Sequence, residues 1–219
     1  MKIFKIMWRS LIIGYETLFS LLLMGATTLL ATVPIITAPF AWAGMRYIAQ
    51  RAVEGRSTTW ADYWQGIKQY GPRNVANQLL LILFFGSALG NLWFYNNPAV
   101  SPLPPEIVPW LSGVWIVGMV IGSGVAFYLL AFQMEMAEPR FWSSLRNSLF
   151  LTLLRPIQTL IAVLFLLIVA VGIRFVPPII LLYPGLLAVL SANTVKTFLK
   201  AITASQETQE RSEKSGETL

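Results

Sequence analysis

Long stretches without a charged residue dominate the chain. A transmembrane helix needs about 20 mainly apolar residues. Five stretches without Asp, Glu, Lys or Arg are long and apolar enough, and they are Thr17–Met45, Asn74–Pro105, Ile107–Met134, Pro156–Ile173 and Phe175–Val195. Without their polar and proline-rich ends, they predict spans near residues 18–38, 75–95, 110–132, 156–173 and 178–197. The pattern therefore predicts an all-α, polytopic transmembrane helical bundle of about five spans.

Two of these stretches contain breaks that affect the topology. Arg174 and the pair Pro177-Pro178 separate the last two stretches, and we expect a hairpin turn there because the combined length exceeds a bilayer. In the first stretch, Pro34 and Pro39 allow a re-entrant hairpin in place of one span. A true span is the favoured interpretation because residues 17–45 are too few for two full spans. A cleaved signal peptide is disfavoured because the apolar run leads directly into more membrane protein.

The basic residues predict the orientation, because cytoplasmic connections carry an excess of Lys and Arg. Five spans with the N-terminus outside place 12 basic residues in the cytoplasm and 4 on the other side. We therefore expect a cytoplasmic C-terminus. Residues 1–200 are expected to form one transmembrane helical domain, followed by a disordered polar tail over residues 201–219.

Two connections have the period of amphipathic helices. After the first span, Thr59 and Asp62 match a capping box, and Gly71-Pro72 is expected to stop the helix that they open. Its apolar stripe consists of Trp60, Tyr63, Trp64, Ile67 and Tyr70. After the third span a second stripe consists of Phe141, Trp142, Leu145, Leu149 and Leu153. We expect both helices to lie at the cytoplasmic interface, where they pack against the spans or present a docking surface.

Composition narrows the function. Hydrophobic residues make up 56% and charged residues 12%, which excludes an ordinary soluble domain. The chain has no Cys and no His, so it lacks thiol chemistry, the usual general base and the commonest metal ligand. Glu135 and Glu138 lie on one helix face but are better explained as partners of nearby arginines. No catalytic residue, metal or cofactor is expected. Two GxxxG motifs, Gly86–Gly90 and Gly118–Gly122, predict close helix packing.

Residues 33–47 form a short proline-containing motif that ends in an arginine and a tyrosine. The stretch reads VPIITAPFAWAGMRY, with Pro34, Thr37, Pro39 and Arg46 in place. It resembles the opening signature of the YesL-like family of bacterial integral membrane proteins, a domain of unknown function. One departure is Ala38, where that signature has glycine. The resemblance implies a multi-pass protein of the bacterial cytoplasmic (inner) membrane. It also suggests a transport accessory role beside sugar ABC-type importers, and it does not imply an enzymatic activity.

These observations support two hypotheses of function. The first is a non-catalytic accessory or scaffold protein that binds anionic lipid headgroups, or another membrane protein such as an ABC importer, and no nucleic acid. The residues expected to do so lie on the basic, aromatic cytoplasmic face and are Arg46, Arg51, Trp64, Lys68, Arg73, Arg140 and Arg146.

The second hypothesis is a small transporter or solute-binding membrane subunit for a neutral solute. It places a cavity between the first three spans, lined by the polar residues Thr32, Ser87, Asn91 and Ser123. The scarcity of intramembrane charge argues against ion coupling but allows a neutral or apolar solute. An intramembrane enzyme is the least favoured of the possibilities.

Overall fold

The computed structural model describes the backbone of residues 2–136 and 140–216 and the side chains of residues 3–136 and 140–204. The described residues form helices and no strand, so the predicted all-α class is confirmed. The helices are α1 Lys2–Glu16, α2 Leu18–Thr32, α3 Ala38–Val53, α4 Trp60–Tyr95, α5 Val108–Glu135, α6 Phe141–Leu154, α7 Pro156–Gly172 and α8 Ile179–Gly216.

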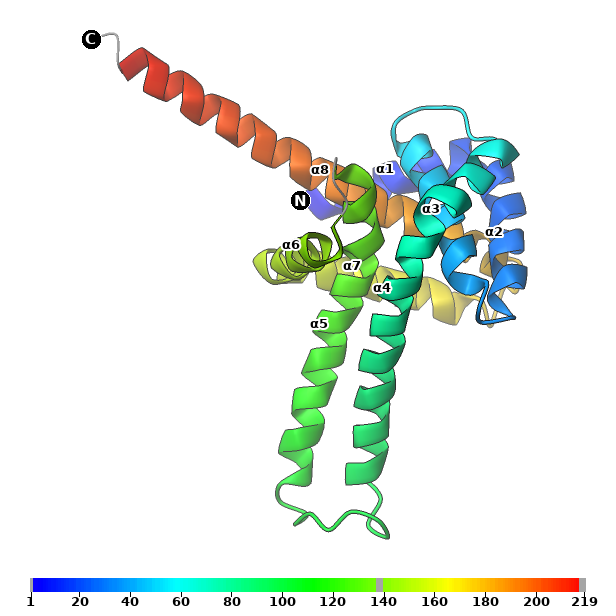
Figure 1. Ribbon diagram of the computed structural model, residues 1–219, viewed down its shortest axis with the longest axis vertical. Helices are drawn as coiled ribbons and strands as arrows, with labels where there is room; N and C mark the ends of the chain where they lie inside the picture. The colour runs from blue at the N-terminus through cyan, green and yellow to red at the C-terminus, as the bar shows by residue number, and fades with distance from the viewer. Residues whose placement is uncertain (1, 137–139, 217–219) are drawn as a thin grey trace.

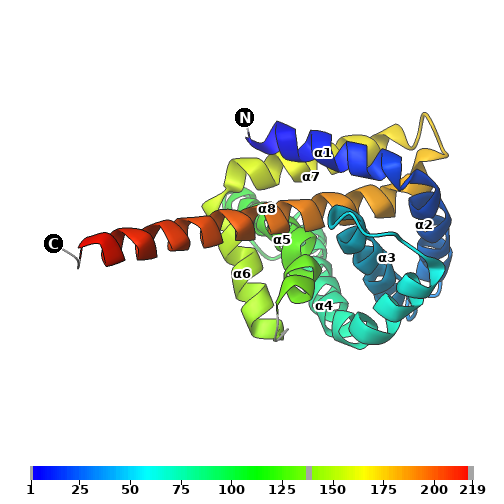
Figure 2. The ribbon, with the colours of Figure 1, turned by 90° about the horizontal axis from the view of Figure 1, so that it is seen from above.

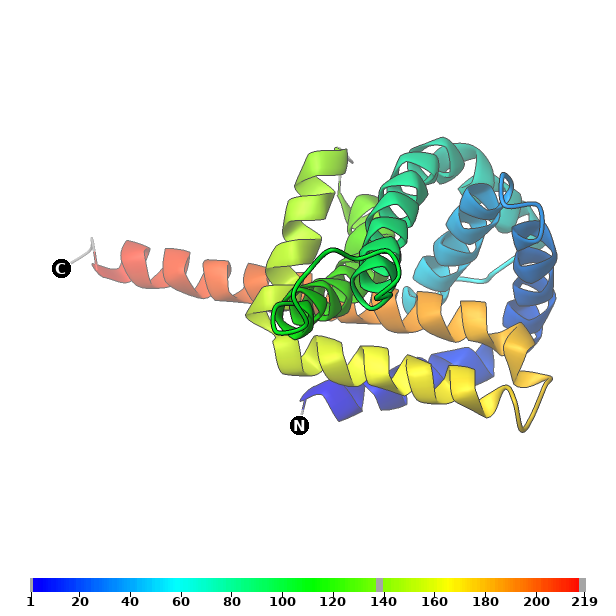
Figure 3. The ribbon, with the colours of Figure 1, turned by 90° about the horizontal axis from the view of Figure 1, so that it is seen from below.

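The long helices α4 and α5 form an antiparallel hairpin that projects from the rest of the molecule (Figure 1). Seen along the hairpin, α1, α7 and α8 run side by side across its base, and α6 crosses their direction (Figures 2 and 3). Helix α3 lies inside this assembly and contacts α2, α4, α5 and α8. The interior on the α2–α4 side of the protein is therefore built around α3.

Three helices are long and apolar enough to cross a membrane by themselves: α4, α5 and residues 179–204 of α8. Two further pairs, α1 with α2 and α6 with α7, reach this length only together, and they are bent by 89° and 98°. The described residues thus contain up to five candidate spans. This number agrees with a helical membrane protein, as the hydrophobic pattern predicted.

The first predicted span is broken. Helix α2 ends at Thr32, residues 33–37 turn the chain, and α3 returns alongside α2 (Figure 1). The turn forms because Pro34 lacks an N–H, while the Thr37 hydroxyl donates to the carbonyls of Ala31 and Pro34. The favoured single span over residues 18–38 is therefore wrong, and the structure has the helical hairpin that was the alternative.

The predicted stop at Gly71-Pro72 is also wrong, because α4 is one helix of 36 residues that passes through Pro72 and ends at Tyr95. The capping box at its start is confirmed, since the Thr59 N–H donates to Asp62 Oδ2 at 2.9 Å. Tertiary contacts hold the helix on both sides of the proline. Gly71 packs against the ring of Phe40, and Asn74 Nδ2 donates to the Pro39 carbonyl at 2.6 Å.

The second predicted amphipathic helix is present as α6, which ends at a sharp bend before Pro156, but most of its apolar stripe does not pack against the other helices. Trp142, Leu149 and Leu153 of that stripe are exposed, whereas the buried residues of α6 are Ser144, Ser148, Leu151 and Thr152. The predicted turn between the last two apolar stretches is present at residues 173–178. Beyond it, the backbone of α8 continues to Gly216, whereas a disordered tail was expected from Ala201. Nine of residues 201–216 are Ala, Gln, Glu, Lys or Arg, which have high helix propensity, and the segment continues a helix that is already nucleated.

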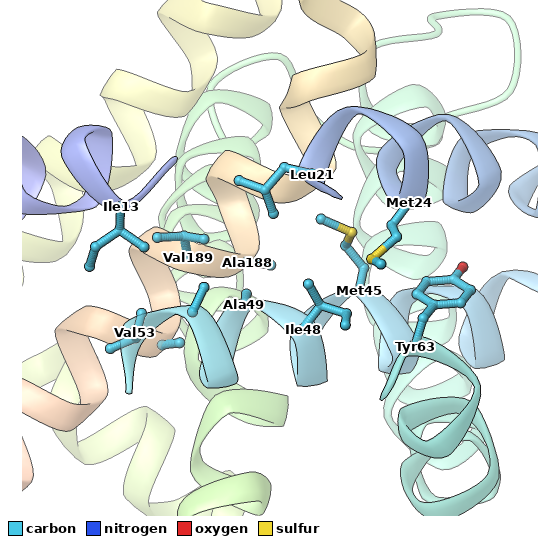
Figure 4. Close-up of a cluster of buried hydrophobic side chains, with 12 residues drawn as sticks. Ile13, Leu21, Met24, Met45, Ile48, Ala49, Val53, Tyr63, Ala188 and Val189 are labelled. Carbon is cyan, nitrogen blue, oxygen red and sulfur yellow. The ribbon is translucent and has the colours of Figure 1, made fainter. Parts of the chain in front are cut away.

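Buried apolar side chains from α1, α2, α3, α4 and α8 meet in one cluster (Figure 4). Met45 and Ile48 lie at its centre and are fully buried. A second cluster joins α1, α5, α6, α7 and α8 around Tyr128, Phe132 and Leu190. Because α8 contributes to both clusters, it connects the α2–α3 side of the molecule with the α5–α7 side.

The two GxxxG motifs have different roles. A Cβ atom at Gly122 would lie 2.5 Å from the ring of Phe84, so the α5 motif allows α4 to approach closely. Nothing lies within 4 Å of the Cβ positions of Gly86 and Gly90. Close packing is therefore confirmed for the α5 motif only.

We predict opposite responses to two glycine substitutions. A Cβ atom at Gly25 would lie 2.1 Å from the Leu181 carbonyl oxygen, and backbone cannot move aside easily. Gly25→Ala should therefore lower the free energy of unfolding by roughly 1–3 kcal/mol. Gly86→Ala, which meets no atom within 4 Å, is the matched control and should leave it unchanged or raise it by up to about 1 kcal/mol, because Ala is the better helix former. Unfolding of the purified protein in detergent measures both, and equal effects would contradict the α2–α8 contact.

Candidate functional site

The centre of the site is Arg46, which lies on the most enclosed helix of the molecule. Eleven of the 16 residues of α3 are buried, because small residues such as Ala43 and Ala49 let neighbouring helices approach. Arg46 itself is only 8% exposed. Its Nη1 donates to the Phe127 carbonyl of α5 at 3.0 Å and to Ser191 Oγ of α8 at 2.7 Å. One side chain thus joins three helices.

Arg46 has no counter-ion among the described residues. The ion pairs found there join Arg51 to Asp62, and Glu54 to Arg56 and Lys196. Glu135 borders the same small void of about 10 Å³ as Arg46, but its Oε1 accepts from Gln50 Nε2 at 3.2 Å and forms no ion pair with Arg46. Burial lowers the pKa of Arg46 to about 10, so the guanidinium is charged at neutral pH. A buried charge without a partner is costly and marks a candidate functional group.

A cavity of about 370 Å³ opens beside this guanidinium, in the size range of about 300–1,000 Å³ that is typical of ligand pockets. Helices α3, α4, α5, α7 and α8 all contribute to its wall. Most of the wall is apolar and includes Leu81, Phe85, Val163, Leu166, Leu167 and Leu187. The side chains with polar atoms are Trp42, Arg46, Ser123 and Tyr183. Such a wall can hold an apolar body and hydrogen-bond a polar group.

A layer of amides lies on the other side of Arg46. A smaller cavity of about 70 Å³ is bordered by Arg46, Asn74 and Asn77. Asn77 and Gln133 exchange two hydrogen bonds of 3.0 Å between α4 and α5, and Asn77 Nδ2 also lies 3.3 Å from Asn74 Oδ1. These buried amides satisfy one another, so they fix the register of α4 and α5 next to the cavity.

The residues predicted for docking separate into two groups. Arg46 is buried, and this corrects its predicted place on a docking face, because its side chain is used between helices. Arg51 is half-buried, its Nη1 lies 3.4 Å from Asp62 Oδ1, and its Nε donates to the Ser57 carbonyl. The others lie at the surface and are Trp64, Lys68, Arg73, Arg140 and Arg146. Trp64 and Lys68 border one open depression at the start of α4.

Of the residues predicted to line a cavity, Ser123 does so, and its hydroxyl donates to the Met119 carbonyl of its own helix at 2.8 Å. Thr32 bonds the Thr28 carbonyl at the end of α2, away from this cavity. Ser87 and Asn91 lie further along α4, where Asn91 Nδ2 donates to the Ser87 carbonyl. The predicted placement of these three is therefore wrong. It assumed that the first apolar stretch was a straight span beside the next two, whereas that stretch folds back on itself.

Arg46 immediately follows an uncharged stretch, so its position in the sequence predicted a residue at the membrane surface. Its burial was therefore not expected. A usable signal is the composition around it. Trp42, Ala43, Gly44, Ala49 and Ala52 surround Arg46 on all sides of a helix, which is unusual for a solvent-exposed basic residue.

No protein-family model, no curated protein and no solved structure matches this chain. The resemblance to the YesL-like family therefore stays an expectation.

We predict that the amide pair beside the cavity contributes to stability only as a pair. Asn77→Leu leaves the buried Gln133 amide without its partner and should cost about 1–3 kcal/mol of unfolding free energy. Asn91→Leu, on the same helix but bonded to its own backbone, should cost little. The double variant Asn77→Leu/Gln133→Leu should recover most of the loss. Additive losses in a double-mutant cycle would show that the two amides do not interact.

Proposed function

We propose that this chain is a non-catalytic membrane protein that binds a small amphiphilic solute in the cavity beside Arg46. This proposal keeps the solute-binding hypothesis and moves its site to the junction of α3, α4, α5, α7 and α8. The observation that carries it is the uneven distribution of polarity, with an apolar wall and a few polar side chains that include a buried charge. Ligand pockets in proteins have this composition.

The mouth of the cavity supports access from the bilayer. Leu167 borders the cavity and is 58% exposed, so the cavity opens beside the apolar outer surface of α7. Leu164 and Ile168, on the same helix, are exposed as well. A solute dissolved in the hydrocarbon region can reach such an opening without crossing water.

We predict that filling the cavity abolishes saturable binding. Val163→Trp places an indole in the cavity wall, whereas Val171→Trp adds the same side chain to an exposed position of α7 outside it. The purified protein in nanodiscs of zwitterionic lipid is titrated with a polarity-sensitive fluorescent probe that carries one alkyl chain. The wild type and Val171→Trp should bind it saturably, and Val163→Trp at least tenfold more weakly. Partitioning that never saturates in the wild type would refute a binding site.

A second candidate function is the accessory or scaffold role, and one observation favours it. Trp64 is 48% exposed and lies near the exposed Lys68. The indole ring of Trp60 packs edge-on against the indole ring of Trp64. An exposed indole next to a basic side chain suits the headgroup zone of a membrane. We propose anionic lipid headgroups as the partner, or another membrane protein such as an ABC-type importer, at the cytoplasmic face of a bacterial inner membrane.

This second candidate predicts an effect of surface charge. A basic residue near an anionic leaflet contributes about 1 kcal/mol, so the double variant Lys68→Gln/Arg73→Gln, which loses about 2 kcal/mol, should reduce recovery of co-purified anionic lipid about 30-fold. Arg174→Gln, on the exposed turn before α8, is the control and should leave it unchanged. Mass spectrometry of lipids and of cross-linked proteins from the native membrane measures both. Equal lipid and partner recovery from all three proteins would exclude docking through this surface.

A further inference from the structure

The guanidinium of Arg46 has donors that its protein partners do not use. Arginine carries five N–H donors, and both hydrogen bonds described above use Nη1. Among the described residues, every fully buried side-chain nitrogen or oxygen has a hydrogen-bond partner. Nε and Nη2, which have none, therefore retain contact with open space. Arg46 borders the cavity of about 370 Å³, the one of about 70 Å³ and the void of about 10 Å³ that it shares with Glu135, so nearly all of the open space beside it belongs to the site.

The charge of Arg46 is also uncompensated. Its two acceptors, the Phe127 carbonyl and the Ser191 hydroxyl, are neutral. Among the residues that the structure describes, no Asp or Glu borders the larger cavity. Removing a charge from water without a counter-ion costs several kcal/mol, and an anion placed against the guanidinium would offset that cost. A neutral solute would not offset this desolvation cost.

The other polar side chains of the cavity suit an anion. Trp42, Ser123 and Tyr183 can each donate a hydrogen bond, and none of them carries a negative charge at neutral pH. The remaining wall consists of Leu, Val, Phe and Ala side chains and ends at the half-exposed Leu167. The volume of about 370 Å³ lies near the lower end of the range for ligand pockets, which favours a ligand with one alkyl chain.

We infer that the ligand is a single-chain amphiphile with an oxyanion head group, a carboxylate or a phosphate, that pairs with Arg46. Its chain lies along α7 and reaches the cavity mouth at Leu167. Nε and Nη2 form the planar fork that binds two oxygens of one oxyanion. This inference rests on the proposed function, because it names the ligand class of the same cavity.

A chain-matched series tests the head group directly. Dodecanoate, dodecyl phosphate, dodecanol and dodecylamine compete for the fluorescent probe on the full-length protein in zwitterionic nanodiscs. Both anions should compete at least tenfold better than dodecanol, and dodecylamine worst of all. Inorganic phosphate alone at the same concentration should not compete, because it lacks the chain.

Variants of Arg46 then assign the selectivity to this residue. Arg46→Met should lower the affinity for both anions to that of dodecanol and leave dodecanol binding unchanged. Arg46→Lys keeps the charge without the fork and should retain part of the preference. Arg9→Met, at an exposed position of α1 outside the cavity, is the control and should keep the full preference. Size-exclusion chromatography and circular dichroism confirm that each variant is folded.

The outcomes separate the two proposals. Dodecanol binding as tightly as dodecanoate would overturn the oxyanion inference while leaving a solute-binding cavity. Anion preference that survives in Arg46→Met, or competition by inorganic phosphate alone, would also overturn it. Loss of saturable binding of every compound, with no difference between Val163→Trp and the wild type, would overturn the proposed function itself. If Arg46→Met does not fold, the wild-type series with Arg46→Lys still decides the inference.

Discussion

The structure depends on a charged side chain that is held where water is scarce. Arg46 joins α3 to α5 and α8 through one nitrogen, and the helices around it can close only because small residues surround it on α3. Two neutral acceptors take hydrogen bonds from one nitrogen of the guanidinium, but they do not compensate its positive charge. The rest of the group faces a cavity, so the fold contains a costly feature that a purely structural core would avoid.

The neighbouring polar layer limits how far this region can relax. The reciprocal amides of Asn77 and Gln133 hold α4 against α5, and Asn74 holds α4 to the start of α3. With these contacts in place, the helices cannot simply collapse onto the space beside Arg46. A cavity with fixed walls and one charged end is the physical basis for proposing selective binding rather than general affinity for lipid.

The two proposed binding surfaces occupy different parts of the molecule. The cavity is formed where the hairpin of α4 and α5 meets α7 and α8, and Trp64 and Lys68 lie at the far start of α4. Helix α4 connects the two surfaces, because it continues without interruption through Pro72. Binding in the cavity and binding at the surface can therefore be separated by substitution, because no residue borders both.

The sequence by itself determined the helical class, the approximate positions of α5 and α6, the capping box at Thr59 and the break before α8, because these depend on local apolar length and turn chemistry. Tertiary structure decided the continuity of α4 through Pro72, the reversal between α2 and α3, and the burial of Arg46. Each of these depends on contacts between residues far apart in the chain. The sequence of one segment shows that a proline or a charge is energetically costly there. It does not show which residues, distant in the chain, make the contacts that offset this cost.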